Sequence, residues 1–268
     1  MVSTPTIITM FIVVAALVAV PVAVLILFAR KVTMNLSTVF LGLIMFVGFD
    51  TILLGLFDSV VMSSVAATLY DYIHANELAF VIYYSFMRAF VYTVGLYTMA
   101  RMSMRSDTNG GGIALGIGAG ATRCILGGAW IMITNISTSF KINKDGLDTL
   151  LAGESADKLE ALKTQASTLL DATPLDIFHY CAESILMLFV FLAAGVIIHI
   201  AATHRGSILL MYLCMALMLI VFAIPAMYQV GYLTNPGLYE IILAGATAII
   251  GGTAIWIGRK YMLNPMKY

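Results

Sequence analysis

The chain has 268 residues, of which 61% are hydrophobic and only 10% are charged. Soluble domains carry about a quarter charged residues, so this composition excludes an ordinary soluble domain and indicates an integral membrane protein. The fourteen basic and fourteen acidic side chains cancel. Binding of nucleic acid needs a basic surface, and we therefore predict no nucleic-acid partner.

Seven apolar stretches are long enough to cross a bilayer as helices, which takes about 20 residues each. They predict an all-α bundle of seven transmembrane helices that forms a single membrane domain over residues 1–268, in the cell membrane. The stretches lie at about residues 5–29, 38–61, 78–99, 112–133, 177–200, 208–228 and 238–257. Pro21 lies inside the first stretch and predicts a kink there.

Basic residues in the loops predict the orientation of the bundle, because such residues gather on the cytoplasmic side. Eight of them fall on the side of the C-terminus, and four fall on the other side, all in one long loop. We therefore predict that the N-terminus is outside and the C-terminus inside.

The long loop, residues 135–173, is predicted to be extracytoplasmic and to contain an amphipathic helix. Residues 155–170 have helical periodicity, with charged side chains on one side and five apolar ones on the other: Leu159, Leu162, Ala166, Leu169 and Leu170. We expect this helix to lie on the membrane or to cap the bundle. Binding of a partner is the alternative.

Four ionisable residues lie within the predicted spans: Asp50, Arg88, Arg123 and Glu183. An isolated charge at the centre of a membrane helix costs about 3 kcal/mol or more. Because two charges of each sign cancel, we predict that the four face the interior, either as a paired network or around a wet cavity. Two interpretations stay open, a structural network of ion pairs and a site for a ligand or a proton.

Candidates for metal binding are few. His179 and Glu183 are four residues apart and so share one helix face, but two ligands on one helix do not make a site without a third. A histidine at the membrane interface is the simpler interpretation. Cys124, Cys181 and Cys214 lack the CxxC spacing of zinc sites, and small buried side chains are the simpler interpretation of them. No cofactor is predicted.

Three features of the sequence carry a resemblance to a known family. They are the opening MVSTPTII, the proline in the first span, and GIGAGATR at residues 116–123. With these features the chain resembles the bacterial YhfC-type proteins over essentially its whole length. Those are intramembrane metalloproteases distantly related to the CAAX-prenyl-protease and bacteriocin-processing group.

The resemblance implies a GxGHGGxE motif in the fourth span, with a catalytic histidine and glutamate. Gly116, Gly118 and Gly120 match the glycines of that motif. Ala119 stands at the position of the histidine, and Arg123 stands at the position of the glutamate. The glycines are interpreted as sites of close helix packing.

The resemblance also implies paired glutamates in the third span and histidines in the fifth and sixth spans. No Asp or Glu occurs between Glu77 and Asp107. Glu183 matches a glutamate of the fifth span, but Phe191 stands where a histidine follows. The sixth span has no histidine, and the expected position is near Ile220.

Metal-assisted hydrolysis needs several ligands and a group that transfers a proton. Since the matching positions hold Ala, Arg, Phe and Ile, we predict a pseudoprotease without catalysis. It would bind the transmembrane segment of a partner, or a lipid-like ligand, as an adaptor or a complex subunit.

Two other hypotheses stay open. A transporter or ligand-binding permease would use the buried cluster of Asp50, Arg88, Arg123 and Glu183 as its site, and prolines and glycines in the spans favour the broken helices of such proteins. An active metalloprotease with a rearranged site would use His179, Glu183 and His74.

Overall fold

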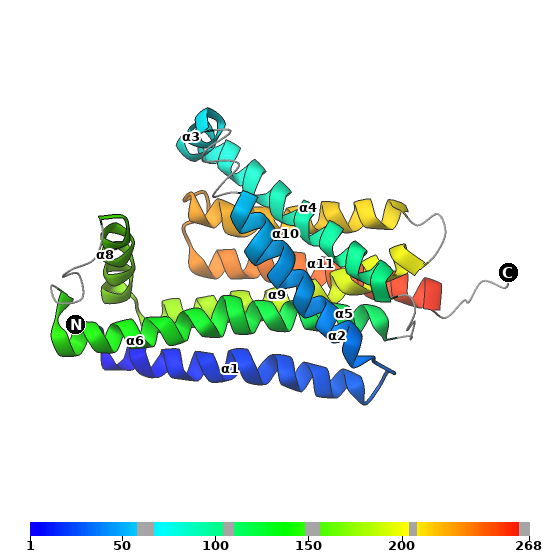
Figure 1. Ribbon diagram of the computed structural model, residues 1–268, viewed down its shortest axis with the longest axis horizontal. Coiled ribbons are helices and arrows are strands. Elements are labelled where there is room, and N and C mark those ends of the chain that lie inside the picture. The colour runs from blue at the N-terminus through cyan, green and yellow to red at the C-terminus, as the bar shows by residue number, and fades with distance from the viewer. Residues whose placement is uncertain (58–66, 104–109, 148–155, 204–207, 263–268) are drawn as a thin grey trace. The chain divides into compact units, whose positions relative to one another are not determined.

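The protein is helical in a computed structural model that describes residues 1–57, 67–103, 110–147, 156–203 and 208–262 (Figure 1). Within these ranges the chain forms helices and no strand. Seven of the described helices are long and apolar enough to cross a membrane. The predicted all-α fold with seven spans is therefore confirmed, while the orientation of the termini stays a prediction.

The spans have the following bounds: α1 (Thr4–Ala29), α2 (Leu36–Met45) with the π-helical segment η1 (Phe46–Leu54), α4 (Glu77–Ser103), α5 (Gly111–Thr122) with the π-helical segment η4 (Arg123–Ala129) and α6 (Trp130–Asp145), α9 (Pro174–Thr203), α10 (Ile208–Gln229) and α11 (Pro236–Met262). Two shorter helices are α3 (Ala67–Ala75) and α8 (Ala156–Asp171).

The fourth span is longer than the sequence predicted. The apolar run ends near Ile133, but the helix continues to Asp145, so the first part of residues 135–173 is helical, and its extracytoplasmic location stays a prediction. The residues between these points are mostly polar, yet they include no glycine or proline that would stop a helix. Gly146 ends it, in a left-handed conformation with φ of 82°.

Contacts divide the described residues into two compact units. The first holds residues 1–20 and 124–185, and the second holds residues 21–123 and 186–262. This division does not test the predicted single membrane domain, which stays a prediction.

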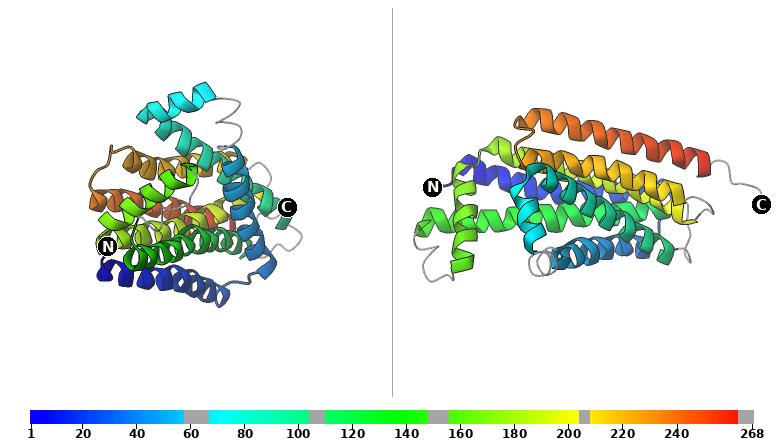
Figure 2. Two further views of the ribbon diagram at one scale, coloured as in Figure 1. Left: turned by 60° about the vertical axis from the view of Figure 1, so that its left-hand side comes forward. Right: turned by 90° about the horizontal axis from the view of Figure 1, so that it is seen from above.

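In the first unit, α8 lies across α6 (Figure 2). Ala166 and Leu169 are buried, which confirms the amphipathic helix. Leu170 was expected on the same side but is exposed. Gln165 of α8 donates a hydrogen bond to the side-chain oxygen of Asn135, at 3.0 Å. Polar contacts thus hold this helix as well as apolar ones.

The N-terminal residues are tied to the first unit by an asparagine. The side chain of Asn143 accepts a hydrogen bond from the backbone N–H of Val2 at 2.7 Å and donates one to the Val2 carbonyl at 2.8 Å. The extension of the fourth span beyond Ile133 is what carries Asn143 to this position.

In the second unit, α5 packs against α2 and α9 through glycines. A Cβ atom added at Gly118 would overlap the Val39 carbonyl of α2, and one added at Gly116 would lie 2.5 Å from the Phe191 carbonyl of α9. From the other side, a Cβ at Gly195 of α9 would lie 2.5 Å from the Gly112 carbonyl. Such close approach of backbones is typical of small residues between membrane helices. The predicted packing role of these glycines is confirmed.

Candidate functional site

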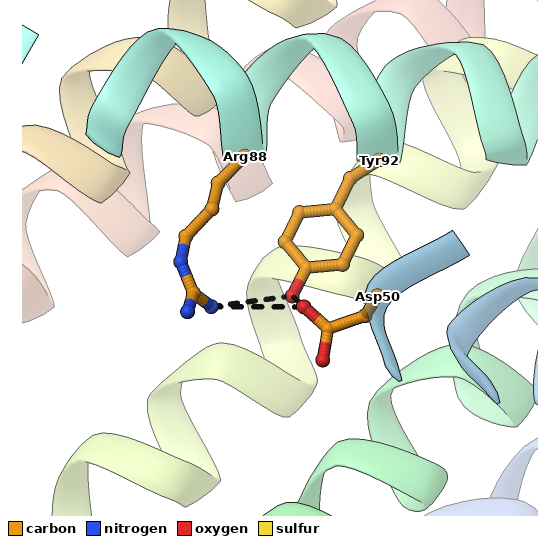
Figure 3. A network of polar contacts seen from close by, with 3 residues as sticks. All are labelled: Asp50, Arg88 and Tyr92. Carbon is orange, nitrogen blue, oxygen red and sulfur yellow. Dashed lines mark hydrogen bonds and ion pairs between the residues drawn. The ribbon is translucent and has the colours of Figure 1, made fainter. Parts of the chain in front are cut away.

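A polar cluster lies inside the second unit, between η1 and α4, and consists of Asp50, Arg88 and Tyr92 (Figure 3). Asp50 lies at the centre of η1. Arg88 and Tyr92 are four residues apart on α4, and this spacing places both side chains on one face of the helix. We call these three residues the Asp50 cluster.

One carboxylate oxygen of Asp50 receives both contacts of the cluster. The Tyr92 hydroxyl donates a hydrogen bond to Oδ1 of Asp50, and Nη1 of Arg88 lies 3.7 Å from the same oxygen. Nη1 of Arg88 also lies 3.5 Å from the Tyr92 hydroxyl. The aspartate is therefore engaged by a cation and by a neutral donor at once.

Aromatic rings surround the Tyr92 end of the cluster. The ring of Tyr92 stacks on Phe46 and Phe222, with centroids 6.2 Å and 5.1 Å apart, and meets the edge of Phe191 at 4.9 Å. The Arg88 guanidinium lies over Tyr84, 4.4 Å from the ring centroid. Apolar surroundings strengthen an ion pair because they lower the local dielectric.

Arg123 and Glu183 are the other two predicted members of the buried charge cluster. Arg123 is the first residue of η4 and belongs to the second unit, close enough for its charge to act on Arg88 and Tyr92. Glu183 lies on α9 in the first unit. The structure thus joins Asp50 to Arg88, and the pairing of Glu183 stays a prediction.

Both π-helical segments carry a membrane charge. Asp50 sits within η1, and Arg123 opens η4. In η4 the carbonyl of Gly127 accepts a hydrogen bond from the Tyr180 hydroxyl at 2.5 Å, a contact within the first unit. Short π-helical stretches often mark functional sites in proteins, so η1 belongs to the candidate site of the second unit.

Tyr92 is the member of the cluster that sequence reasoning missed. A signal for it exists, because it stands four residues after Arg88, where a helix brings side chains together. Its hydroxyl needs a partner once the ring is buried, and the ring is only 1% exposed.

Two of the substituted motif positions hold buried packing residues. Ala119 and Phe191 are buried, at 0% and 1% exposure, whereas Ile220 is 56% exposed. On α10 the residue that contacts the Asp50 cluster is Phe222, which stacks on Tyr92. A histidine at Ile220 would face away from the cluster, and the position on α10 that faces it is occupied by an aromatic ring.

The residues of the described part do not fit a metal-binding site. No group of three or more His, Cys, Asp or Glu side chains in the described ranges is close enough to hold a metal ion. Asp50 is already engaged by Arg88 and Tyr92. The rings of His74 and Tyr70 are tilted against each other with centroids 3.9 Å apart, and Nδ1 of His74 lies 2.9 Å from the Tyr70 carbonyl oxygen. His179 and Glu183 stay weak candidates.

The fold and the cluster define a multi-pass membrane protein with a polar site among its helices. Residues 15–243 match the family described as YhfC intramembrane metalloprotease, and the chain belongs to this family. No curated protein and no solved structure matches it. The resemblance found in the sequence is therefore confirmed, and the chain is an intramembrane metalloprotease-like membrane protein.

Proposed function

We propose that this chain is a non-catalytic member of its family that binds the transmembrane segment of a partner protein in the cell membrane, as an adaptor or a subunit of a complex. The observation that carries the proposal is the set of contacts that the Asp50 carboxylate makes. Its carboxylate is held by a guanidinium and a hydroxyl, and a cation beside a carboxylate opposes the binding of a divalent metal.

The framework of the family supports the same conclusion. The glycines of the motif hold α5 against α2 and α9, while the positions of reactive groups hold Ala119 and Phe191, both buried in the core. A chain that keeps the packing of an enzyme and replaces its reactive groups is suited to binding without hydrolysis.

The proposal is tested by co-purification of the full chain in a mild detergent, with mass spectrometry of the bound proteins. We expect to recover a membrane protein in a fixed ratio to the chain, with its transmembrane segment uncleaved. The Asp50→Leu/Arg88→Leu variant is purified in the same way as a control, and a specific partner is one that this variant does not bind. Specific cleavage of the partner that is lost in Asp50→Asn or Glu183→Gln would overturn the proposal.

A second candidate function is a permease, and the π-helical segments favour it. Transporters place substrate and ion sites where membrane helices depart from regular geometry, and both Asp50 and Arg123 lie on such segments. Uptake of a solute into proteoliposomes that is abolished by Arg123→Gln would support this candidate over the adaptor. Equal uptake by the wild type and the variant would count against it.

A further inference from the structure

The Asp50 cluster has an open polar edge. Oδ1 of Asp50 receives both contacts, and Figure 3 shows the second carboxylate oxygen turned away from Arg88 and Tyr92. No described residue makes a hydrogen bond to this second oxygen, or to Nε or Nη2 of Arg88. The side chains of Arg88 and Asp50 are 22% and 17% exposed, so neither side chain is fully enclosed.

This edge lies deep in the predicted membrane. Arg88 is eleven residues after Glu77 and fifteen before Ser103, the ends of α4. With a rise of about 1.5 Å per residue, it is about 16 Å or more from either end of the helix. Polar atoms at such depth lack water as a partner, and each unsatisfied group is costly there.

The chemistry of the edge selects the ligand. The free carboxylate oxygen accepts a hydrogen bond, and the free guanidinium nitrogens donate. Asp50 and Arg88 cancel each other's charge, so the pair offers a ligand hydrogen bonds and not an unpaired charge. A carboxamide supplies one donor and one acceptor without charge and complements both groups.

From this complementarity we propose that the Asp50–Arg88 pair binds a partner's membrane helix through a single asparagine or glutamine side chain. The proposal rests on the proposed function, since it names the chemistry of the partner that the adaptor binds. The amide nitrogen donates to the free oxygen of Asp50, and the amide oxygen accepts from Arg88. Hydrogen bonds of this kind are a known source of association between membrane helices.

The test uses the full chain in lipid nanodiscs and synthetic membrane peptides. The probe is a fluorescent leucine–alanine helix of about 20 residues with one glutamine at its centre, and the controls carry leucine or lysine at that position. Binding is measured by energy transfer to a labelled chain. We expect the glutamine peptide to bind about five- to tenfold tighter than the leucine peptide, and the lysine peptide to bind no better than leucine.

Two variants locate the effect. Asp50→Leu/Arg88→Leu leaves no charge in the membrane and is expected to abolish the preference for glutamine. Arg88→Lys keeps the positive charge but lacks the planar fork of donors, and it is expected to reduce the preference. Thr253→Val removes a polar group from α11, where the hydroxyl bonds to the Ile249 carbonyl, and it should leave the preference unchanged.

Equal binding of glutamine and leucine peptides by the wild type would overturn the inference, and so would a preference for lysine. A preference for glutamine that persists in the double leucine variant would overturn it as well. Cleavage of the peptides is followed by mass spectrometry in the same samples. Cleavage would contradict the proposed function, whereas absent preference without cleavage contradicts this inference alone.

Discussion

Two regions of the second unit share the framework of the family but have different uses. The glycines of α5 match the motif that the resemblance implies, and they make backbone contacts with α2 and α9. The Asp50 cluster lies between η1 and α4, outside that motif, and holds a carboxylate with its charged and polar contacts. The comparison shows that the glycines of a motif can serve helix packing alone, while the charged and polar contacts lie between η1 and α4.

The largest effect is expected where a side chain is added to the glycine packing. Gly118→Ala places a methyl group against the Val39 carbonyl of α2, and backbone atoms cannot move aside as a side chain can. We expect a loss of about 3 kcal/mol in the free energy of unfolding, measured by denaturation in detergent. Gly251→Ala, where an added Cβ meets nothing within 4 Å, is the matched control and should be neutral or slightly stabilising. Equal effects of the two changes would contradict the packing role.

A smaller effect is expected when one member of the ion pair is removed. Asp50→Leu leaves Arg88 in the membrane without its partner, and we expect a loss of about 2 kcal/mol in the free energy of unfolding. The double variant Asp50→Leu/Arg88→Leu should lose less than Asp50→Leu alone, because it leaves no unpaired charge. A double-mutant cycle measures the coupling, and additive losses would show that the pair does not act as a unit.

The smallest effect is expected from the tyrosine hydroxyl. Tyr92→Phe keeps the ring and its contacts with Phe191 and Phe222 but removes the donor to Asp50. We expect a loss of about 1 kcal/mol in the free energy of unfolding. Tyr212→Phe, at an exposed site on α10, is the control and should have no effect. If the two variants behave alike, the hydroxyl of Tyr92 contributes nothing to the cluster.

Much of the fold follows from the sequence, because the length of an apolar run and the bilayer thickness together fix a membrane helix. The seven spans and the amphipathic helix α8 were predictable on this basis. The extension of α6 to Asp145 was not, since polar residues can continue a helix beyond the apolar run. The short helix α3 was not predicted either, because nine residues cannot span a bilayer.

The candidate site was predictable only in part. The cost of a charge in a membrane predicted that Asp50 and Arg88 would find partners, and they contact each other. The π-helical form of η1 and η4 carries no periodic signal in the sequence, because it depends on contacts between helices. The pairing of Glu183 stays a prediction, because it depends on how distant segments of the chain pack.

The central claim is that this chain keeps the framework of a metalloprotease family without its metal chemistry. The most direct test is to purify the full chain from cells grown with added zinc and to measure its metal content by elemental mass spectrometry. The account predicts no stoichiometric zinc, and no difference between the wild type, Asp50→Asn and Glu183→Gln. One zinc ion per chain that is lost in either variant would contradict the account and would make His179 the next residue to change.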